Sequence, residues 1–81
     1  MLKLYYLTNF LGKIMKNNIA IIRNQSDISI EQLSAMTGIS IEDLKEIEKG
    51  QLEPTLIDAY HITKSLKKDF LAEVFIFDDL D

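Results

Sequence analysis

Cysteine is absent from this 81-residue chain, which excludes a disulfide framework, a thiolate nucleophile and a cysteine-ligated zinc site. Only three glycines and one proline interrupt it, and 47% of its residues are hydrophobic, a composition typical of a globular, mainly helical protein. Long apolar runs are also lacking, since none approaches the ~20 residues that a membrane-spanning helix requires. No small-residue cleavage site follows the apolar N-terminus. We therefore expect one cytoplasmic domain without a membrane segment.

Positive charge is scarce over most of the chain, whose formal net charge is −4. Residues 1–30 hold four basic side chains and one acidic side chain, a balance of +3. Residues 31–81 hold five basic and twelve acidic side chains, a balance of −7. Because a nucleic-acid-binding protein usually shows a basic surface, this balance argues against a broad electrostatic footprint.

The sequence contains no group of residues typical of an enzyme. His61 is the only histidine, and its place between Tyr60 and Ile62 favours a helix-surface position over a role as ligand or base. No nucleophile is accompanied by a base, and no glycine-rich phosphate loop is present. The three acids within residues 78–81 are typical of a solvated chain end. We predict no catalytic residue, no cofactor and no metal site.

Apolar spacing and helix-breaking residues divide residues 18–75 into five predicted helices. The first covers 18–26 and is ended by Asp27, since Asp tolerates the left-handed conformation. The fourth covers 55–66, and Asp69 is expected to cap a short fifth helix. The apolar faces of these three helices are assigned to Ile19 and Ile22, to Leu56, Ala59, Tyr60, Thr63 and Leu66, and to Phe70, Leu71, Val74 and Phe75.

The second and third predicted helices have clear capping signals. Ser29 is a typical N-cap, and Gln32 three residues later completes a capping box. Gly38 supplies the positive φ that a sharp turn needs, and Ser40 then caps the third helix, with Asp43 at the reciprocal position. The residues expected on the buried faces are Leu33 and Met36 in the second helix and Ile41, Leu44 and Ile47 in the third, which Gly50 ends.

Two terminal segments flank this domain, an amphipathic extension at 1–17 and an acidic tail at 76–81. The apolar stripe of the extension consists of Leu4, Leu7, Leu11 and Ile14. Its spacing and the lysines opposite it favour a helix, whereas the β-prone stretch LKLYYL favours a strand, and both alternatives are open for residues 1–14. Such a stripe either packs, on the domain core or on a dimer partner, or lies on a membrane surface, and packing is the simpler interpretation. The tail either extends the last helix or forms a short β-strand.

Five short motifs stand in a fixed order along residues 18–66. They are Asn18-Ile19 with Ile22-Arg23, the S-x-E-x-L of Ser29, Glu31 and Leu33, Gly38-Ile39-Ser40, Ile47-Glu48-Lys49-Gly50, and Pro54-Thr55-Leu56. In these motifs the chain resembles the Xre/Cro-type, lambda-repressor-like helix-turn-helix proteins of bacteria and phages. The resemblance implies an all-α, five-helix domain over 18–75 and a small transcription regulator that binds double-stranded DNA as a homodimer.

The same resemblance implies roles for individual residues. Arg23 and Glu48 are expected to form a partly buried, structural ion pair. The recognition helix would be residues 41–49, with its N-terminal part against base edges. The residues that correspond to the DNA-binding positions of the family are Ser29, Ile30, Ser40, Ile41, Glu42, Asp43, Lys45, Glu46 and Lys49.

The acidic residues of this helix leave two functions open. Phosphate attraction supplies most non-specific DNA affinity, and here Glu42, Asp43 and Glu46 outnumber the lysines. One acid is compatible with DNA reading, since Glu accepts a hydrogen bond from cytosine N4. Acids in the first turn are also stabilised by the positive end of the helix dipole, whatever the helix binds. The alternative is a helix-turn-helix scaffold that binds a protein partner through its acidic face, as an antirepressor or inhibitor would, with weak or no DNA binding.

Overall fold

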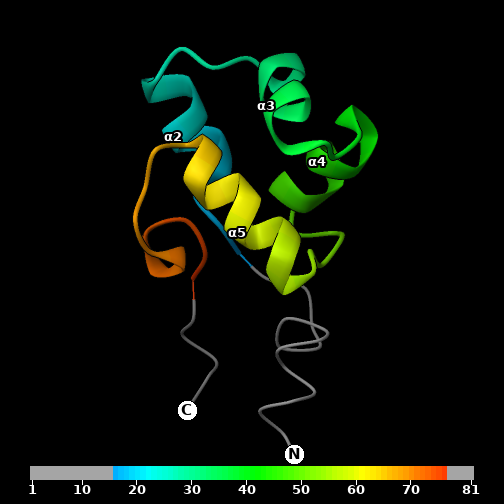
Figure 1. The fold of residues 1–81 in the computed structure, drawn as a ribbon. Coiled ribbons are helices and arrows are strands. Elements are labelled where there is room, and N and C mark those ends of the chain that lie inside the picture. The colour runs from blue at the N-terminus through cyan, green and yellow to red at the C-terminus, as the bar shows by residue number, and fades with distance from the viewer. Residues whose placement is uncertain (1–15, 77–81) are drawn as a thin grey trace, which may run out of the picture.

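The computed structural model describes residues 16–76, which form four α-helices and one 3₁₀ turn (Figure 1). In chain order these elements are α2 (Ile19–Gln25), α3 (Ile30–Thr37), α4 (Ile41–Glu48), α5 (Leu56–Ser65) and the 3₁₀ turn η2 (Leu71–Glu73). No strand occurs between residues 16 and 76, so this part of the chain is all-α. The expectations for residues 1–15 and 77–81 lie outside the described residues.

A fifth α-helix, predicted after Asp69, is replaced by η2. The Glu73 carboxylate accepts hydrogen bonds from the backbone N–H groups of Asp69 and Phe70, at 3.1 and 3.0 Å. Asp69 therefore contributes its backbone N–H instead of a capping carboxylate, and Phe70 is 69% exposed. Val74 and Phe75 are buried, so this tight turn brings two apolar side chains into the core without a longer helix.

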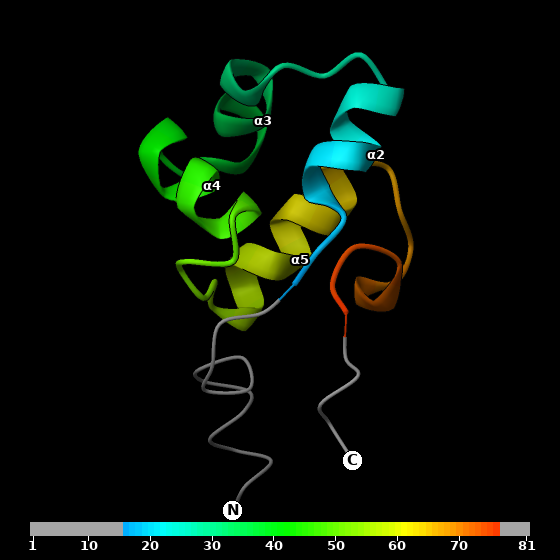
Figure 2. The ribbon, with the colours of Figure 1, turned by 180° about the vertical axis from the view of Figure 1, so that it is seen from behind.

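The core lies between α5 and the three preceding helices. Figures 1 and 2 show α5 running through the middle of the molecule, with α3 and α4 on one side, η2 on the other, and α2 behind it in the view of Figure 1. Between them lie Ile19, Ile22, Leu33, Ile39, Leu44, Ile47, Ala59, Ile62, Leu66, Val74 and Phe75. Each α-helix contributes one or two of these side chains, so no helix could bury its apolar stripe without the others.

Besides Phe70, two other side chains predicted on apolar faces are exposed. Met36 is 50% exposed and Tyr60 is 54% exposed, although their sequence spacing places each near a buried stripe. In α3 only Leu33 is fully buried, and Met36, three residues later, lies over a groove between α3 and the end of α5. In α5 the buried residues are Ala59, Ile62 and Thr63. Because these three side chains define the buried side of the helix, Tyr60 lies outside it. His61 is exposed beside Tyr60, as the sequence indicated.

Both ends of the described chain are fixed to one another. Asn17 and Phe75 form an antiparallel bridge, with the Asn18 N–H donating to the Val74 carbonyl at 2.7 Å. The Asn17 side-chain amide also donates to the carbonyl of Ile47 at 2.8 Å, which joins this bridge to the end of α4. None of the helices found in residues 16–76 has the length and apolarity needed to cross a bilayer.

Candidate functional site

The first helix of the candidate site, α3, begins at a complete capping box. The Ser29 hydroxyl accepts the backbone N–H of Gln32 at 3.0 Å, and the Gln32 side-chain oxygen accepts the backbone N–H of Ser29 at 2.7 Å. Two N–H groups that an isolated helix would leave unpaired are satisfied in this way. The start of α3 is therefore fixed by local contacts, as the sequence predicted.

The turn between α3 and α4 is held by glycine and by two hydroxyl groups. Gly38 has φ +77°, the left-handed conformation that glycine adopts without a Cβ clash. The Thr37 hydroxyl donates to the Leu33 carbonyl at 2.8 Å and accepts the Ile39 N–H at 3.2 Å. The Ser34 hydroxyl donates to the carbonyl of Ile39. These hydroxyl contacts fix the path from one helix to the next.

Sequence analysis did not identify Ser34 and Thr37 as contributors to the site. The available signal was the position of a serine and a threonine within the last turn of a helix ended by glycine. Hydroxyl side chains at such places often bond to nearby backbone groups. Their partners depend on how the turn folds back, which the local sequence alone does not specify.

The second helix of the site, α4, is capped at one end and held by its apolar side. The Ser40 hydroxyl accepts the backbone N–H of Asp43 at 3.0 Å. Leu44 and Ile47 are buried in the core, and Ile41 is half-buried. The opposite side of α4 therefore faces solvent and is presented on a rigid support.

The exposed side of α4 carries both signs of charge. Of the nine residues expected to contact DNA, seven are exposed, namely Ser29, Ser40, Glu42, Asp43, Lys45, Glu46 and Lys49. Ile30 and Ile41 are half-buried, and Ile30 packs against the core, so it supports the start of α3. We refer to Glu42, Asp43, Lys45, Glu46 and Lys49 as the α4 outer face.

The electrostatic balance of the α4 outer face is close to neutral. Its three carboxylates exceed its two ammonium groups by one. The Lys49 ammonium lies 3.6 Å from the Glu46 carboxylate, an exposed pair one helical turn apart, so part of its charge is already compensated. Within residues 16–76, Lys45 has no ion-pair partner, which leaves it as the side chain of this face best placed to attract an anion.

Behind α4, Arg23 and Glu48 lie in contact. Two guanidinium nitrogens of Arg23 donate to the Glu48 carboxylate, Nε at 2.9 Å and Nη2 at 3.4 Å. The third nitrogen, Nη1, donates to the carbonyl of Ile28 at 3.1 Å. Arg23 thus joins the end of α2, the α2–α3 linker and the end of α4, and these contacts fix the C-terminal end of α4 in the domain.

Comparison with known proteins agrees with this arrangement of two helices and a glycine turn. A family model described as helix-turn-helix matches residues 19–71, which is more than half of the chain. This chain belongs to the helix-turn-helix family of the Xre and lambda-repressor type. In this helix-turn-helix protein, α3 and α4 are the two helices of the motif, and α4 occupies the position of the recognition helix.

Two similar proteins have names that state a regulatory class. One is an uncharacterized HTH-type transcriptional regulator of Methanothermobacter thermautotrophicus, 28% identical over 57 residues that cover 70% of this chain and 83% of that protein. The other is the uncharacterized HTH-type transcriptional regulator y4dJ of Sinorhizobium fredii, 30% identical over 54 residues, or 67% of this chain and 70% of that protein.

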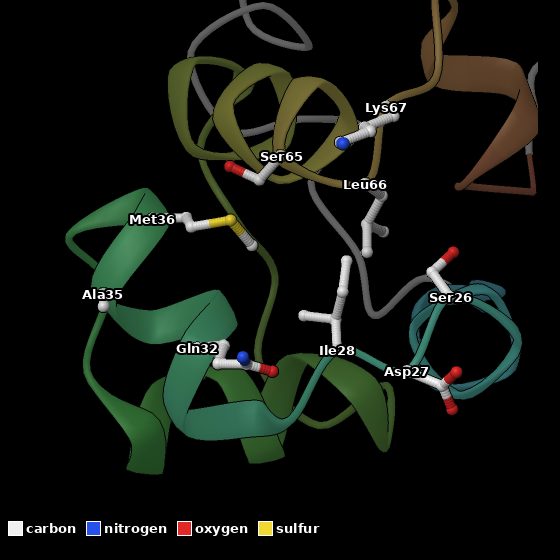
Figure 3. Close-up of a pocket in the computed structure, with 9 residues that line it drawn as sticks. All are labelled: Ser26, Asp27, Ile28, Gln32, Ala35, Met36, Ser65, Leu66 and Lys67. Atoms are coloured by element: carbon white, nitrogen blue, oxygen red, sulfur yellow. The ribbon is translucent and has the colours of Figure 1, made fainter.

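A groove of about 530 Å³ lies apart from the α4 outer face (Figure 3). Ile28, Met36 and Leu66 give it apolar walls, while Asp27 and Lys67 lie at its edge. Both of these charged residues have positive φ, +57° and +62°, because each follows the end of a helix in a Schellman-type cap. None of the nine lining residues belongs to α4.

Proposed function

We propose that this helix-turn-helix protein is a transcription regulator that places α4 in the major groove of double-stranded DNA. The observation that supports this proposal is the α4 outer face, which is exposed while Leu44 and Ile47 hold the helix in the core. A major groove admits one α-helix, and a rigidly held helix presents its side chains in a fixed register.

The contacts with DNA divide into positioning and reading groups. The N-terminal ends of α3 and α4, at Ser29 and Ser40, offer backbone N–H groups and hydroxyls to phosphates. Lys45, which has no ion-pair partner among the residues between 16 and 76, provides positive charge. Glu42, in the first turn of α4, is placed to accept a hydrogen bond from a cytosine amino group. The proposed specificity therefore depends on few contacts for each protomer.

A homodimer is part of the proposal, because one such face gives little affinity. Each lysine that neutralises a phosphate contributes about −0.9 to the slope of log K against log salt, so a protomer with two lysines binds weakly by electrostatics alone. Two protomers on a pseudo-palindromic site would double the contacts. The half-sites would then lie about 34–36 Å apart, one helical turn of DNA.

The test is a binding titration with duplexes selected from a random-sequence library at low salt. We expect selected duplexes to bind, and Lys45→Ala to weaken binding and make the salt slope shallower by about 1 for each protomer. Lys67→Asn is the matched control, since it removes one positive charge outside α4 and asparagine tolerates the left-handed conformation. Failure of every duplex to bind at low salt would contradict the proposal.

The acidic residues of the α4 outer face favour a second candidate function, binding of a basic protein partner. Glu42 and Glu46 are both exposed on this helix, and the carboxylates outnumber the lysines. Charge reversal separates the two functions by the sign of its effect. Glu42→Lys together with Glu46→Lys would strengthen binding of arbitrary duplex under the first proposal, whereas under the second it would abolish capture of the basic partner.

A further inference from the structure

An apolar patch lies on the outer side of α5, opposite the core. Ile57 is 68% exposed, and Tyr60, one helical turn later on the same side, is exposed as well. Leu52, also exposed, lies in the loop that leads into this helix. In Figure 1 no other described element passes in front of α5. We call Leu52, Ile57 and Tyr60 the α5 patch.

The chain enters the described domain close to the loop before α5. Lys16 and Asn17 line a shallow groove together with Gly50 and Gln51. The hydrogen bond from the Asn17 amide to the Ile47 carbonyl fixes this entry point beside the end of α4. Gln51 is directly followed by Leu52, so the fifteen residues that precede Lys16 start from the end of the α5 patch that Leu52 marks. As a helix they would span about 22 Å, more than the ~15 Å length of α5.

The residues that precede Lys16 have a composition that complements the α5 patch. Leu4, Leu7, Leu11 and Ile14 form an apolar stripe at helical spacing, with lysines outside it. Acidic side chains accompany the α5 patch, with Glu53 next to Leu52 and Asp58 next to Ile57. The opposite charge balances of residues 1–30 and 31–81, +3 and −7, follow the same pattern. Both the apolar and the charged surfaces are therefore complementary.

We propose that residues 2–14 pack on the α5 patch of their own chain. The tether favours this arrangement over binding of a second copy, because a short linker gives an effective concentration in the millimolar range. The segment covers Ile57 and Tyr60 and leaves the α4 outer face free. The N-terminal extension is then an additional layer of the domain, and α5 is not available as an interface between copies. This inference does not depend on DNA binding.

Absence of cysteine makes a direct cross-linking test possible in the full chain. Ile57→Cys is combined with Leu7→Cys in one variant and with Leu11→Cys in another. The proteins are oxidised at low concentration and separated without reductant. We expect a disulfide within a single chain, since a disulfide forms only where two Cα atoms approach within about 7 Å.

Two matched pairs control for random collisions of the segment. In the first, Ile57→Cys is combined with Asn9→Cys, which lies opposite the stripe on a helix. In the second, Leu7→Cys is combined with Ile21→Cys, on the exposed side of α2. If residues 2–14 pack on the α5 patch, the two variants that combine Ile57→Cys with Leu7→Cys or Leu11→Cys should oxidise about tenfold faster than either control. Equal rates, or disulfides that join two chains, would overturn the proposal, and the second result would assign the patch to another copy.

Discussion

Arg23 and Glu48 join two helices that are distant in sequence, with the Arg23 Nε atom 2.9 Å from the Glu48 carboxylate. Their side chains are only 16% and 13% exposed, so water screens the pair weakly. Because Arg23 also donates to the carbonyl of Ile28, the pair connects the end of α4 with the linker that precedes α3. The orientation of α4 therefore depends on a contact outside the helix-turn-helix motif itself.

Removal of one charge from this pair should destabilise the domain strongly. Glu48→Gln leaves the Arg23 guanidinium without its counter-charge in a mostly buried position, which costs about 3 kcal/mol of unfolding free energy. Urea denaturation followed by circular dichroism measures this loss. The double variant Arg23→Met with Glu48→Leu should recover much of it, since no buried charge remains. A loss below about 1 kcal/mol for Glu48→Gln would show that the pair is solvated and of little structural importance.

Substitution of Gly38 should reveal strain without a steric clash. No atom lies within 4 Å of a Cβ added at this position, so the cost of Gly38→Ala arises from its φ of +77° alone. We expect a loss of about 1–2 kcal/mol for alanine, measured by thermal or urea unfolding. Gly38→Asn is the control, and its smaller loss would follow from the tolerance of asparagine for left-handed φ. Equal losses would indicate a different cause, such as a change in the turn.

Substitution by glycine should change the free energy of unfolding in opposite directions at Lys67 and at Lys68. Lys67 has φ +62°, and relief of this strain is worth about 1–2 kcal/mol, while glycine costs about 0.5–1 kcal/mol of chain entropy. Lys67→Gly should therefore raise the free energy of unfolding by about 0.5 kcal/mol. Lys68→Gly, which relieves no such strain, should lower it. The same sign for both variants would contradict this explanation.

Removal of acidic charge from the α4 outer face should strengthen DNA binding. A carboxylate about 8 Å from a phosphate in water opposes binding by ~0.5 kcal/mol, or about twofold in Kd. Glu42→Gln and Glu46→Gln should each lower the Kd for arbitrary duplex by about this factor, and the effect should decrease with added salt. Asp69→Asn, which removes an exposed charge next to η2, serves as the control. Unchanged or weaker binding would indicate that the duplex does not contact the α4 outer face.

Much of this fold could be predicted from local sequence, because local contacts determine it. The capping box of Ser29 and Gln32, the N-cap at Ser40 and the glycine turn at Gly38 all involve groups within four residues of one another. Such contacts are available as soon as the chain folds locally. The order and approximate bounds of α2 to α5 followed from them.

Burial at the edges of the helices could not be predicted in the same way. Met36 has helical spacing to Leu33, yet it is half-exposed because it lines a groove between α3 and the end of α5. The helix expected after Asp69 is a 3₁₀ turn, since Val74 and Phe75 enter the core where Asn17 and Asn18 pair with the same segment. These features depend on contacts between residues far apart in sequence.

For the candidate site, the sequence predicted the exposed side of α4 but not how its side chains are connected. The spacing of Leu44 and Ile47 predicted which side of α4 is buried, and so which charges face outward. The pairing of Lys49 with Glu46 depends on side-chain conformations, and the third contact of Arg23 depends on the path of the α2–α3 linker. Both alter how much positive charge and rigidity the site has.

The proposed contact between the α4 outer face and duplex DNA can be observed residue by residue in solution. Backbone amide chemical shifts of the isotopically labelled protein are recorded while a selected duplex is added. We expect the largest shift changes at the start of α3, around Ser29, and along residues 40–49, with little change in the outer side of α5. Changes confined to α5 or to the groove near Lys67, with α4 unaffected, would contradict it.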